Sequence, residues 1–181
     1  KSGGWDKPQG YSLSEKTVGI IGFGAIGNAV AARLHPFGAR VLATDIIEIP
    51  ASQSSALNVE MCPLEALLQE SDFVTLHCDL NPTSHHILNA ERLAQCRRET
   101  IVINTARGPL IDEVALVSAL EAGTIAGAGL DVFEHEPLPL DSPLRSMPQA
   151  FLAAHNSNSS PECWQRVHRN SVAMLFEGLG L

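Results

Sequence analysis

The sequence predicts an α/β fold, a doubly wound parallel sheet with helices on both faces, or three αβα layers. Three observations predict it. Short apolar runs alternate with helix-like segments along the chain. A glycine-rich turn joins the first of these runs to the first helix. The later runs end at polar or ionisable residues, a pattern typical of a sheet whose strand ends form a ligand-binding edge.

Composition and charge narrow the class of protein. The 181 residues are 45% hydrophobic and 18% charged, which is typical of a globular α/β protein. The net charge of −8 argues against nucleic-acid and membrane partners, because both offer anionic surfaces. The four cysteines form no C-x-x-C pair. We therefore expect reduced thiols, no metal site and a cytoplasmic protein.

The glycine-rich turn is the sequence Gly-Phe-Gly-Ala-Ile-Gly at 22–27. It follows a predicted buried strand over 17–21 and opens a predicted helix over 25–37. A G-x-G-x-x-G pattern between a strand and a helix is the signature of a Rossmann-type dinucleotide-binding domain.

Each position of this turn has a physical role. Gly22 allows the tight turn, Gly24 lets a pyrophosphate approach the backbone, and Gly27 lets the helix pack close to the strand. The free amides of Ala25 and Ile26 in the first helical turn would face the anion.

The next predicted strand, over 41–45, indicates which dinucleotide binds. It ends at Asp45, eighteen residues after Gly27, close to the spacing expected for a carboxylate that binds the adenosine ribose. The following segment, 46–55, is predicted to be a loop and contains Glu48 but no Lys or Arg. A ribose 2′-phosphate would require a cation here, so we predict NAD rather than NADP.

The remaining elements continue the alternation of strands and helices. In order, we expect a short strand over 57–61, a helix over 63–70, a strand over 72–76, a helix from its cap Asn89 to Cys96, a strand over 100–103, a helix over 113–122 between Asp112 and Gly123, strands over 125–130 and 150–154, and a last helix from Ser160 and Pro161 to about Gly178. As domains, we expect a linker over 1–14, the dinucleotide-binding domain over 15–160, and a helix over 161–181 that leads to a second domain outside this sequence.

Polar residues follow five of the predicted strands. Because the carboxyl ends of parallel strands share one edge of a sheet, these residues should gather there, where ligands bind. They are Asp45, His77, Thr105 with Arg107, Asp131 and His155.

Three residues near this edge are candidates for chemistry, each with a structural alternative. Arg107 can hold a carboxylate bidentately, but it can equally form a surface salt bridge. Glu136 lies in an ionisable loop where a carboxylate–imidazole pair can form, or where an acidic loop is simply exposed. His155 can exchange a proton at neutral pH, or can satisfy loop carbonyls.

Four motifs in order resemble the D-isomer-specific 2-hydroxyacid dehydrogenases. These are the glycine turn, the Asn-Thr-Ala-Arg-Gly segment at 104–108, the Asp-Val-Phe-Glu-His-Glu-Pro segment at 131–137, and His155. The resemblance implies that Arg107 binds the carboxylate and carbonyl of a 2-oxo acid. It also implies that His155 exchanges a proton with the substrate oxygen, and that Glu136 hydrogen-bonds the imidazole.

The same resemblance implies the coenzyme contacts and partners. Asp131 would lie near the nicotinamide carboxamide, and His77, Cys78, Thr105 and Ala106 would line the rest of the groove. The partners would be a 2-hydroxy or 2-oxo acid and a second copy of the chain, paired through the coenzyme domain.

Two alternatives stay open: a non-enzymatic NAD(H)-sensing module of the corepressor type, and an unrelated Rossmann enzyme. The chain departs from the family pattern at Asp79, at Ala154 and over 156–158, which concerns the substrate side more than the coenzyme side. We expect the isolated chain to bind NAD(H) and to turn over slowly or not at all.

Overall fold

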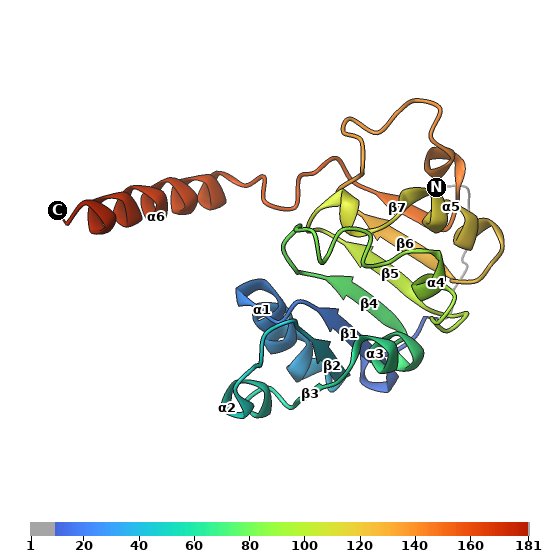
Figure 1. The fold of residues 1–181 in the computed structure, drawn as a ribbon, viewed down its shortest axis with the longest axis horizontal. Helices are drawn as coiled ribbons and strands as arrows, with labels where there is room; N and C mark the ends of the chain where they lie inside the picture. Colours follow the sequence, from blue (N-terminus) through green and yellow to red (C-terminus); the bar gives the residue numbers. More distant parts are fainter. Residues whose placement is uncertain (1–9, 181) are drawn as a thin grey trace, which may run out of the picture.

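The protein folds around a parallel sheet, which the computed structural model describes within residues 10–180. In this part of the chain the sheet has seven strands in the order β3-β2-β1-β4-β5-β6-β7 (Figure 1). All neighbouring strands pair in parallel. The strands are β1 (Thr17–Ile21), β2 (Arg40–Thr44), β3 (Val59–Met61), β4 (Phe73–Leu76), β5 (Ile101–Asn104), β6 (Gly127–Leu130) and β7 (Ala150–Leu152). The prediction of a doubly wound parallel sheet is confirmed.

Helices fill the connections between the strands. They are α1 (Ala25–Leu34), α2 (Ala51–Ser55), α3 (Leu64–Glu70), α4 (Ala90–Leu93), α5 (Glu113–Glu121) and α6 (Pro161–Leu179), with 3₁₀ turns at Leu13–Glu15, His35–Phe37, Gly108–Leu110 and Pro143–Ser146. The helix ends follow the capping residues that the sequence indicates. Asn89, Asp112 and Ser160 each accept a hydrogen bond from a backbone amide in the first turn of their helix. Gly123 ends α5 with a φ of 65°.

Two sequence predictions about helices are wrong. The segment 46–55 is not all loop, because α2 occupies its second half, where the carbonyl of Pro50 accepts the amides of Gln53 and Ser54. The helix after Asn89 ends before Cys96. Beyond α4 the amides bond to carbonyls three residues back, so the chain tightens into a turn instead of continuing the helix.

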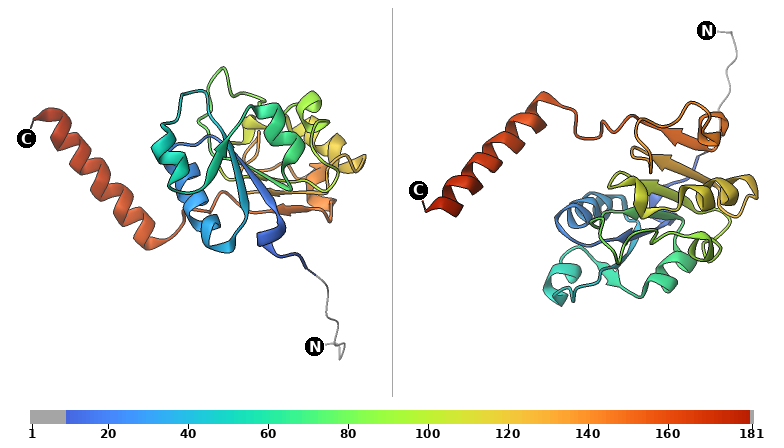
Figure 2. Two further views of the ribbon diagram at one scale, coloured as in Figure 1. Left: turned by 90° about the horizontal axis from the view of Figure 1, so that it is seen from below. Right: turned by 45° about the horizontal axis from the view of Figure 1, so that its top comes forward.

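The two faces of the sheet carry separate cores. Ile21 on β1 packs in the larger core with Leu67 of α3 and Leu116 of α5. Its neighbour Ile20 points to the other face and packs in a smaller core with Ala31 of α1. Successive strand residues alternate between faces, so both faces hold a helical layer (Figure 2). The three-layer prediction is confirmed.

The cover on the α1 side becomes thinner across the sheet. One in-register row runs through Ile20, Thr75, Ile103, Gly129 and Phe151, on β1, β4, β5, β6 and β7. Ile20 is 0% exposed and Thr75 5%, Ile103 and Gly129 are partly exposed, and Phe151 is 79% exposed. The α1 face is therefore buried at β1 and open at β7.

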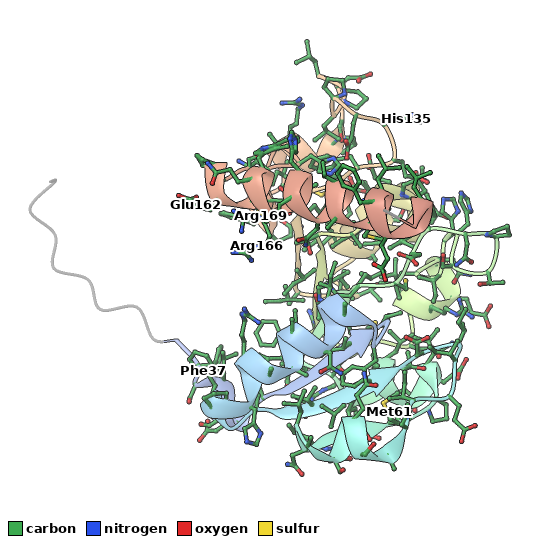
Figure 3. The ribbon with its side chains drawn as sticks, turned by 90° about the vertical axis from the view of Figure 1, so that its left-hand side faces the viewer. Phe37, Met61, His135, Glu162, Arg166 and Arg169 are labelled. Atoms are coloured by element: carbon green, nitrogen blue, oxygen red, sulfur yellow. The ribbon has the colours of Figure 1, made fainter. Side chains whose placement is uncertain are left out.

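The last helix stands apart from the sheet. A turn over 156–160 leads from the sheet to α6, which extends away from the rest of the chain (Figures 1 and 2). Its residues are exposed except for Cys163, which is partly exposed. Figure 3 shows the charged side chains Glu162, Arg166 and Arg169 along this helix. Among the described residues, no helix is long and apolar enough to cross a membrane.

Candidate functional site

The glycine turn has the geometry that its sequence predicts. Gly22 adopts a φ of +94°, and a Cβ there would collide with the backbone of Cys78. A Cβ on Gly27 would collide with the carbonyl oxygen of Gly22, so this glycine lets α1 approach β1. A Cβ on Gly24 would meet nothing within 4 Å. The backbone at Gly24 therefore faces open space.

Asp45 closes this turn from the end of β2. Its Oδ2 accepts the backbone amide of Phe23 at 2.7 Å, and its Oδ1 accepts that of Ile47 at 3.2 Å. The carboxylate thus fixes the glycine turn against the second strand.

A groove of about 640 Å³ opens above the turn. Its lining includes Gly22, Gly24, Ala25, Ile26, Asp45, His77 and Cys78, all predicted coenzyme contacts. The other predicted contacts, Gly27, Thr105, Ala106 and Asp131, are not among its lining residues. The loop 79–87 forms a further wall, from which Asp79, Asn81, Thr83, Ser84 and Ile87 line the groove.

Two ionisable groups in the groove wall are held uncharged by burial. Burial lowers the pKa of His77, whose Nε2 also lies 3.0 Å from the hydroxyl of Thr75. Burial likewise raises the pKa of the Cys78 thiol, and the nearby carboxylates of Asp45 and Asp79 add to this effect. At neutral pH this wall therefore presents a neutral imidazole and a protonated thiol.

The loop carrying Arg107 is set by a buried amide. The side chain of Asn104, at the end of β5, accepts the amide of Ala106 at 3.0 Å and donates to the carbonyl of Arg107 at 2.8 Å. Asn104 is 1% exposed. The guanidinium of Arg107 is exposed and donates to the carbonyl of Ala106. Within the described chain, no carboxylate pairs with it.

The Arg107 loop packs tightly on the loop that follows β6. A Cβ on Gly108 would overlap the backbone of Phe133 and Glu134. The close approach of these two backbones ties the segment carrying Arg107 to the segment carrying Glu136.

Glu136 and His155 form a carboxylate–imidazole pair. Oε2 of Glu136 lies 2.8 Å from Nδ1 of His155, and Oε1 accepts the amide of Phe133 at 3.1 Å. The hydrogen bond to His155 is the main cause that lowers the pKa of Glu136, and the bond from Phe133 adds to it against burial. His135, which lies on the same exposed loop (Figure 3), is not the partner of this carboxylate.

Asp131 holds the turn that carries His155. Its two carboxylate oxygens accept the amides of Asn156 and Ser157, both at 3.0 Å, and its carbonyl accepts the amide of His155 at 2.8 Å. Burial alone would raise the pKa of Asp131, but these bonds and the nearby imidazole lower it. His155 itself adopts a φ of +50°, which this turn supports.

The strand predicted over 150–154 is shorter than expected, because β7 ends at Leu152. The chain nevertheless stays beside β6. The amides of Ala153 and His155 donate to the carbonyls of Leu130 and Asp131. His155 therefore reaches the same edge of the sheet as Asp45 and Arg107.

Sequence reasoning missed two functional contributions. The sequence motif at 104–108 gives no role to Asn104, although an amide directly after a buried strand is a usable signal of a loop-fixing residue. The local sequence around His86 indicates no role for it, yet its Nε2 bonds Glu134. In the part of the chain that the structure describes, no group of three or more His, Cys, Asp or Glu side chains could hold a metal ion.

Comparison with known proteins decides the family. The family described as D-isomer specific 2-hydroxyacid dehydrogenase, NAD binding domain, matches residues 1–157. The chain belongs to this family. Among the curated relatives of this chain, a glyoxylate reductase of Korarchaeum cryptofilum is 46% identical over 158 residues. A hydroxypyruvate reductase of Thermotoga maritima is 40% identical over 186 residues.

Solved dehydrogenase structures resemble the fold as well. A glyoxylate reductase from Paecilomyes thermophila superposes with a TM-score of 0.82 at 35% identity, covering 89% of this chain and 48% of that one. The NAD-complexed D-isomer specific 2-hydroxyacid dehydrogenase of Lactobacillus delbrueckii ssp. bulgaricus gives a TM-score of 0.82 at 29% identity, covering 94% and 55%.

The match covers nearly all of this chain but only part of its relatives. It includes 87% of the chain and 47% of the Korarchaeum protein, and 100% of the chain and 59% of the Thermotoga protein. The chain thus spans about half the length of the curated relatives it matches.

The groove suits the coenzyme of an NAD-binding dehydrogenase domain. Open backbone at Gly24 leaves room for a pyrophosphate, and the amides of Ala25 and Ile26 begin α1 beside it. The exposed side chains of Ile46 and Ile47 offer an apolar wall next to Asp45. These residues fit NAD, which agrees with the sequence prediction.

Proposed function

We propose that the protein containing this chain interconverts a small 2-oxo acid and its D-2-hydroxy acid with NAD(H), and that this domain supplies the coenzyme groove and the acid–base pair. The observation that carries the proposal is the Glu136–His155 pair, which sits beside the Arg107 loop at the edge of the sheet that also bears the groove.

In reduction, His155 donates a proton from Nε2 to the carbonyl oxygen of the substrate. This nitrogen is the one available, because Nδ1 is engaged by Glu136. Glu136 fixes the ring orientation and stabilises the charged imidazolium, which is ready to donate. The bound nicotinamide supplies the hydride. In the reverse direction His155 takes the proton from the hydroxyl.

Arg107 binds the carboxylate and carbonyl of the substrate. An exposed guanidinium with one hydrogen bond to its own loop retains donors for a bidentate contact. The Asn104 side chain fixes the direction in which this loop presents the arginine, through its bonds to Ala106 and Arg107.

The coenzyme contacts follow the sequence prediction. Amides of Ala25 and Ile26 bind the pyrophosphate, Asp45 binds the adenosine ribose, and Asp131 lies near the nicotinamide carboxamide. For Asp131 this role adds to its bonds with Asn156 and Ser157, since each oxygen can accept a second hydrogen bond. The remaining proposed contacts are Gly22, Gly24, Gly27, His77, Cys78, Thr105 and Ala106.

The substrate class is a short, polar 2-oxo acid such as glyoxylate or hydroxypyruvate. Similar proteins carry these names, among them the glyoxylate/hydroxypyruvate reductase B of Escherichia fergusonii, which is 44% identical over 171 residues. The exposed polar run Asn156-Ser157-Asn158 next to His155 favours such substrates over bulky apolar ones.

The test is a reductase assay of the protein that contains this chain, following NADH absorbance with glyoxylate, hydroxypyruvate, pyruvate and phenylpyruvate. We expect turnover with the first two and its abolition by His155→Ala, with NADH binding retained. If NADH binds but no 2-oxo acid is reduced, the NAD(H)-sensing module replaces this proposal. The isolated 181-residue chain should bind NADH and turn over slowly or not at all.

The assembly and location of the protein are also proposals. Pairing of two copies through this domain is supported by the open part of the α1 face at Ile103 and Phe151. Light scattering should then give a dimer mass.

The exposed α6 supports the boundary at 160/161, with 161–181 leading to a substrate domain. The free thiols of all four cysteines fit a cytoplasmic location.

A further inference from the structure

His86 contacts both loops that carry the proposed chemistry. Its backbone amide donates to the carbonyl of Pro109 at 2.9 Å, two residues after Arg107. Its Nε2 lies 2.5 Å from Oε1 of Glu134, two residues before Glu136. One residue therefore links the Arg107 loop and the Glu136 loop.

The same residue lies in the loop 79–87, other residues of which line the coenzyme groove. Ser84 and Ile87, on either side of it, line the groove. This wall is braced, because the hydroxyl of Ser84 donates to the carbonyl of Asp79, and Nη1 of Arg92 donates to the carbonyl of Ile87. His86 thus lies in a braced loop of the groove wall, and its ring contacts Glu134 in the loop that carries Glu136.

Glu134 is held from its other side by α5. Its amide donates to Oε2 of Glu113 at 3.2 Å, and the amide of Glu113 donates to Oε2 of Glu134 at 3.4 Å. The carboxylate of Glu134 therefore lies between an imidazole and the start of a helix. The His86 and Glu134 side chains are 33% and 22% exposed, so the contact between them is partly shielded from water.

The groups around His86 are few and defined. The ring of His85 stacks on it with the centroids 3.9 Å apart, and Oε1 of Glu134 contacts its Nε2. His86 also adopts a φ of +50°, in the left-handed region where Asn, Asp and His are the enriched residues besides Gly. Its surroundings hold it in this conformation.

We propose that His86 is a positioning residue. Through Glu134 it fixes the segment from Phe133 to Glu136, and this segment holds the Glu136 carboxylate against His155 in its position relative to the coenzyme groove. The inference rests on the proposed function in one respect, that Glu136 and His155 act as a pair. The amide of Phe133 is the link, because it donates directly to Oε1 of Glu136.

The test compares His86→Asn with His86→Gln in the 181-residue chain. Both variants remove the same ring, and Asn tolerates the left-handed backbone. The Gln amide nitrogen reaches about as far as the imidazole Nε2 and can still donate to Glu134, whereas the Asn amide is too short. His85→Asn is the control, since the ring of His85 stacks on His86 and forms no hydrogen bond with the described residues.

The readout is the side-chain carboxyl pKa of Glu136, followed by ¹³C NMR in an acid titration. In His86→Asn we expect this pKa to rise towards its ordinary value, by about half a unit or more relative to His86→Gln. The His86→Gln and His85→Asn variants should stay close to the parent chain. Adding NADH should shift the Glu136 resonance in the parent and less in His86→Asn.

Equal Glu136 pKa values in the Asn and Gln variants would overturn the proposal, even if both variants melt at lower temperature than the parent. That result would assign His86 a purely structural role. The titration needs no turnover, so failure of the reductase assay would count against the proposed function alone.

Discussion

Glu136 and His155 are nineteen residues apart in the chain, yet Oε2 of the first lies 2.8 Å from Nδ1 of the second. Two connections produce this contact. The amide of Phe133 fixes the carboxylate, and the backbone of Asp131 fixes the imidazole turn. The pair is therefore set by main-chain hydrogen bonds at the ends of β6 and β7, and Nε2 of His155 is the nitrogen that we propose contacts the substrate.

Replacing the carboxylate tests this arrangement. Glu136→Gln retains the shape of the side chain but loses the charge that stabilises the imidazolium, so the reductase rate should fall by about a hundredfold. NADH affinity should change little, since Glu136 does not line the coenzyme groove. Steady-state kinetics and NADH fluorescence titration measure the two effects. An unchanged rate would refute the assigned role.

Valine substitutions at two glycines of the same turn should have different effects, one on NADH binding and the other on the stability of the fold. A Cβ on Gly24 meets open space, so Gly24→Val should fold normally and lose NADH binding. A Cβ on Gly27 overlaps the carbonyl of Gly22, so Gly27→Val should destabilise the fold by about 3 kcal/mol. Thermal unfolding with and without NADH separates the cases. Normal NADH affinity in Gly24→Val would contradict the placement of the pyrophosphate.

Asp45 should control both affinity and coenzyme choice. In Asp45→Asn, NADH binding should weaken about tenfold, the equivalent of one charge-assisted hydrogen bond. NADPH should bind relatively better, because the repulsion on a 2′-phosphate is gone. Parallel fluorescence titrations with the two coenzymes give the ratio. A ratio that does not move would show that another group discriminates between them.

Lowering the pH should reduce the free energy of unfolding, because Asp131 and Glu136 become protonated. The folded state lowers the pKa of each below its ordinary value, 3.8 for Asp131 and 4.5 for Glu136. Each carboxylate therefore stabilises the fold above its unfolded pKa, and this contribution is lost as pH falls through the lowered folded pKa. Urea unfolding measured between pH 6 and about pH 2 should show this decline in the free energy of unfolding.

The matched variant is Asp131→Asn. It should lower the free energy of unfolding at pH 7 by about 2 kcal/mol, because charge-assisted bonds to Asn156 and Ser157 become neutral ones. Its unfolding free energy should also depend less on pH in the acid range. A parent-like acid profile in this variant would mean that Asp131 is not a source of the dependence.

The sheet and its ligand-binding edge could be predicted because both rest on local signals. Apolar runs mark the strands, and capping residues such as Asp112 and Ser160 mark the helix starts. Parallel strands then bring their carboxyl ends together without further information. This places Asp45, Arg107 and His155 on one edge before any contact is known.

What the sequence did not reveal depends on how loops pack. The pairing of His86 with Glu134 joins residues 48 positions apart, and nothing in their local sequence indicates it. The role of Asn104 depends on the path of the chain around Arg107. The early end of β7 at Leu152 also has no local signal, because Ala153 and Ala154 continue the apolar run.

The strand order separates the residues for coenzyme preference from those proposed for proton transfer, so evolution or design can change the two properties independently. Gly24 and Asp45 follow β1 and β2, whereas Arg107, Glu136 and His155 follow β5, β6 and β7, with β4 between the two sets. Exchanging the segment after β2 for one from an NADP-dependent relative should therefore change the coenzyme preference. The residues proposed for proton transfer, on the other half of the sheet, should keep their arrangement.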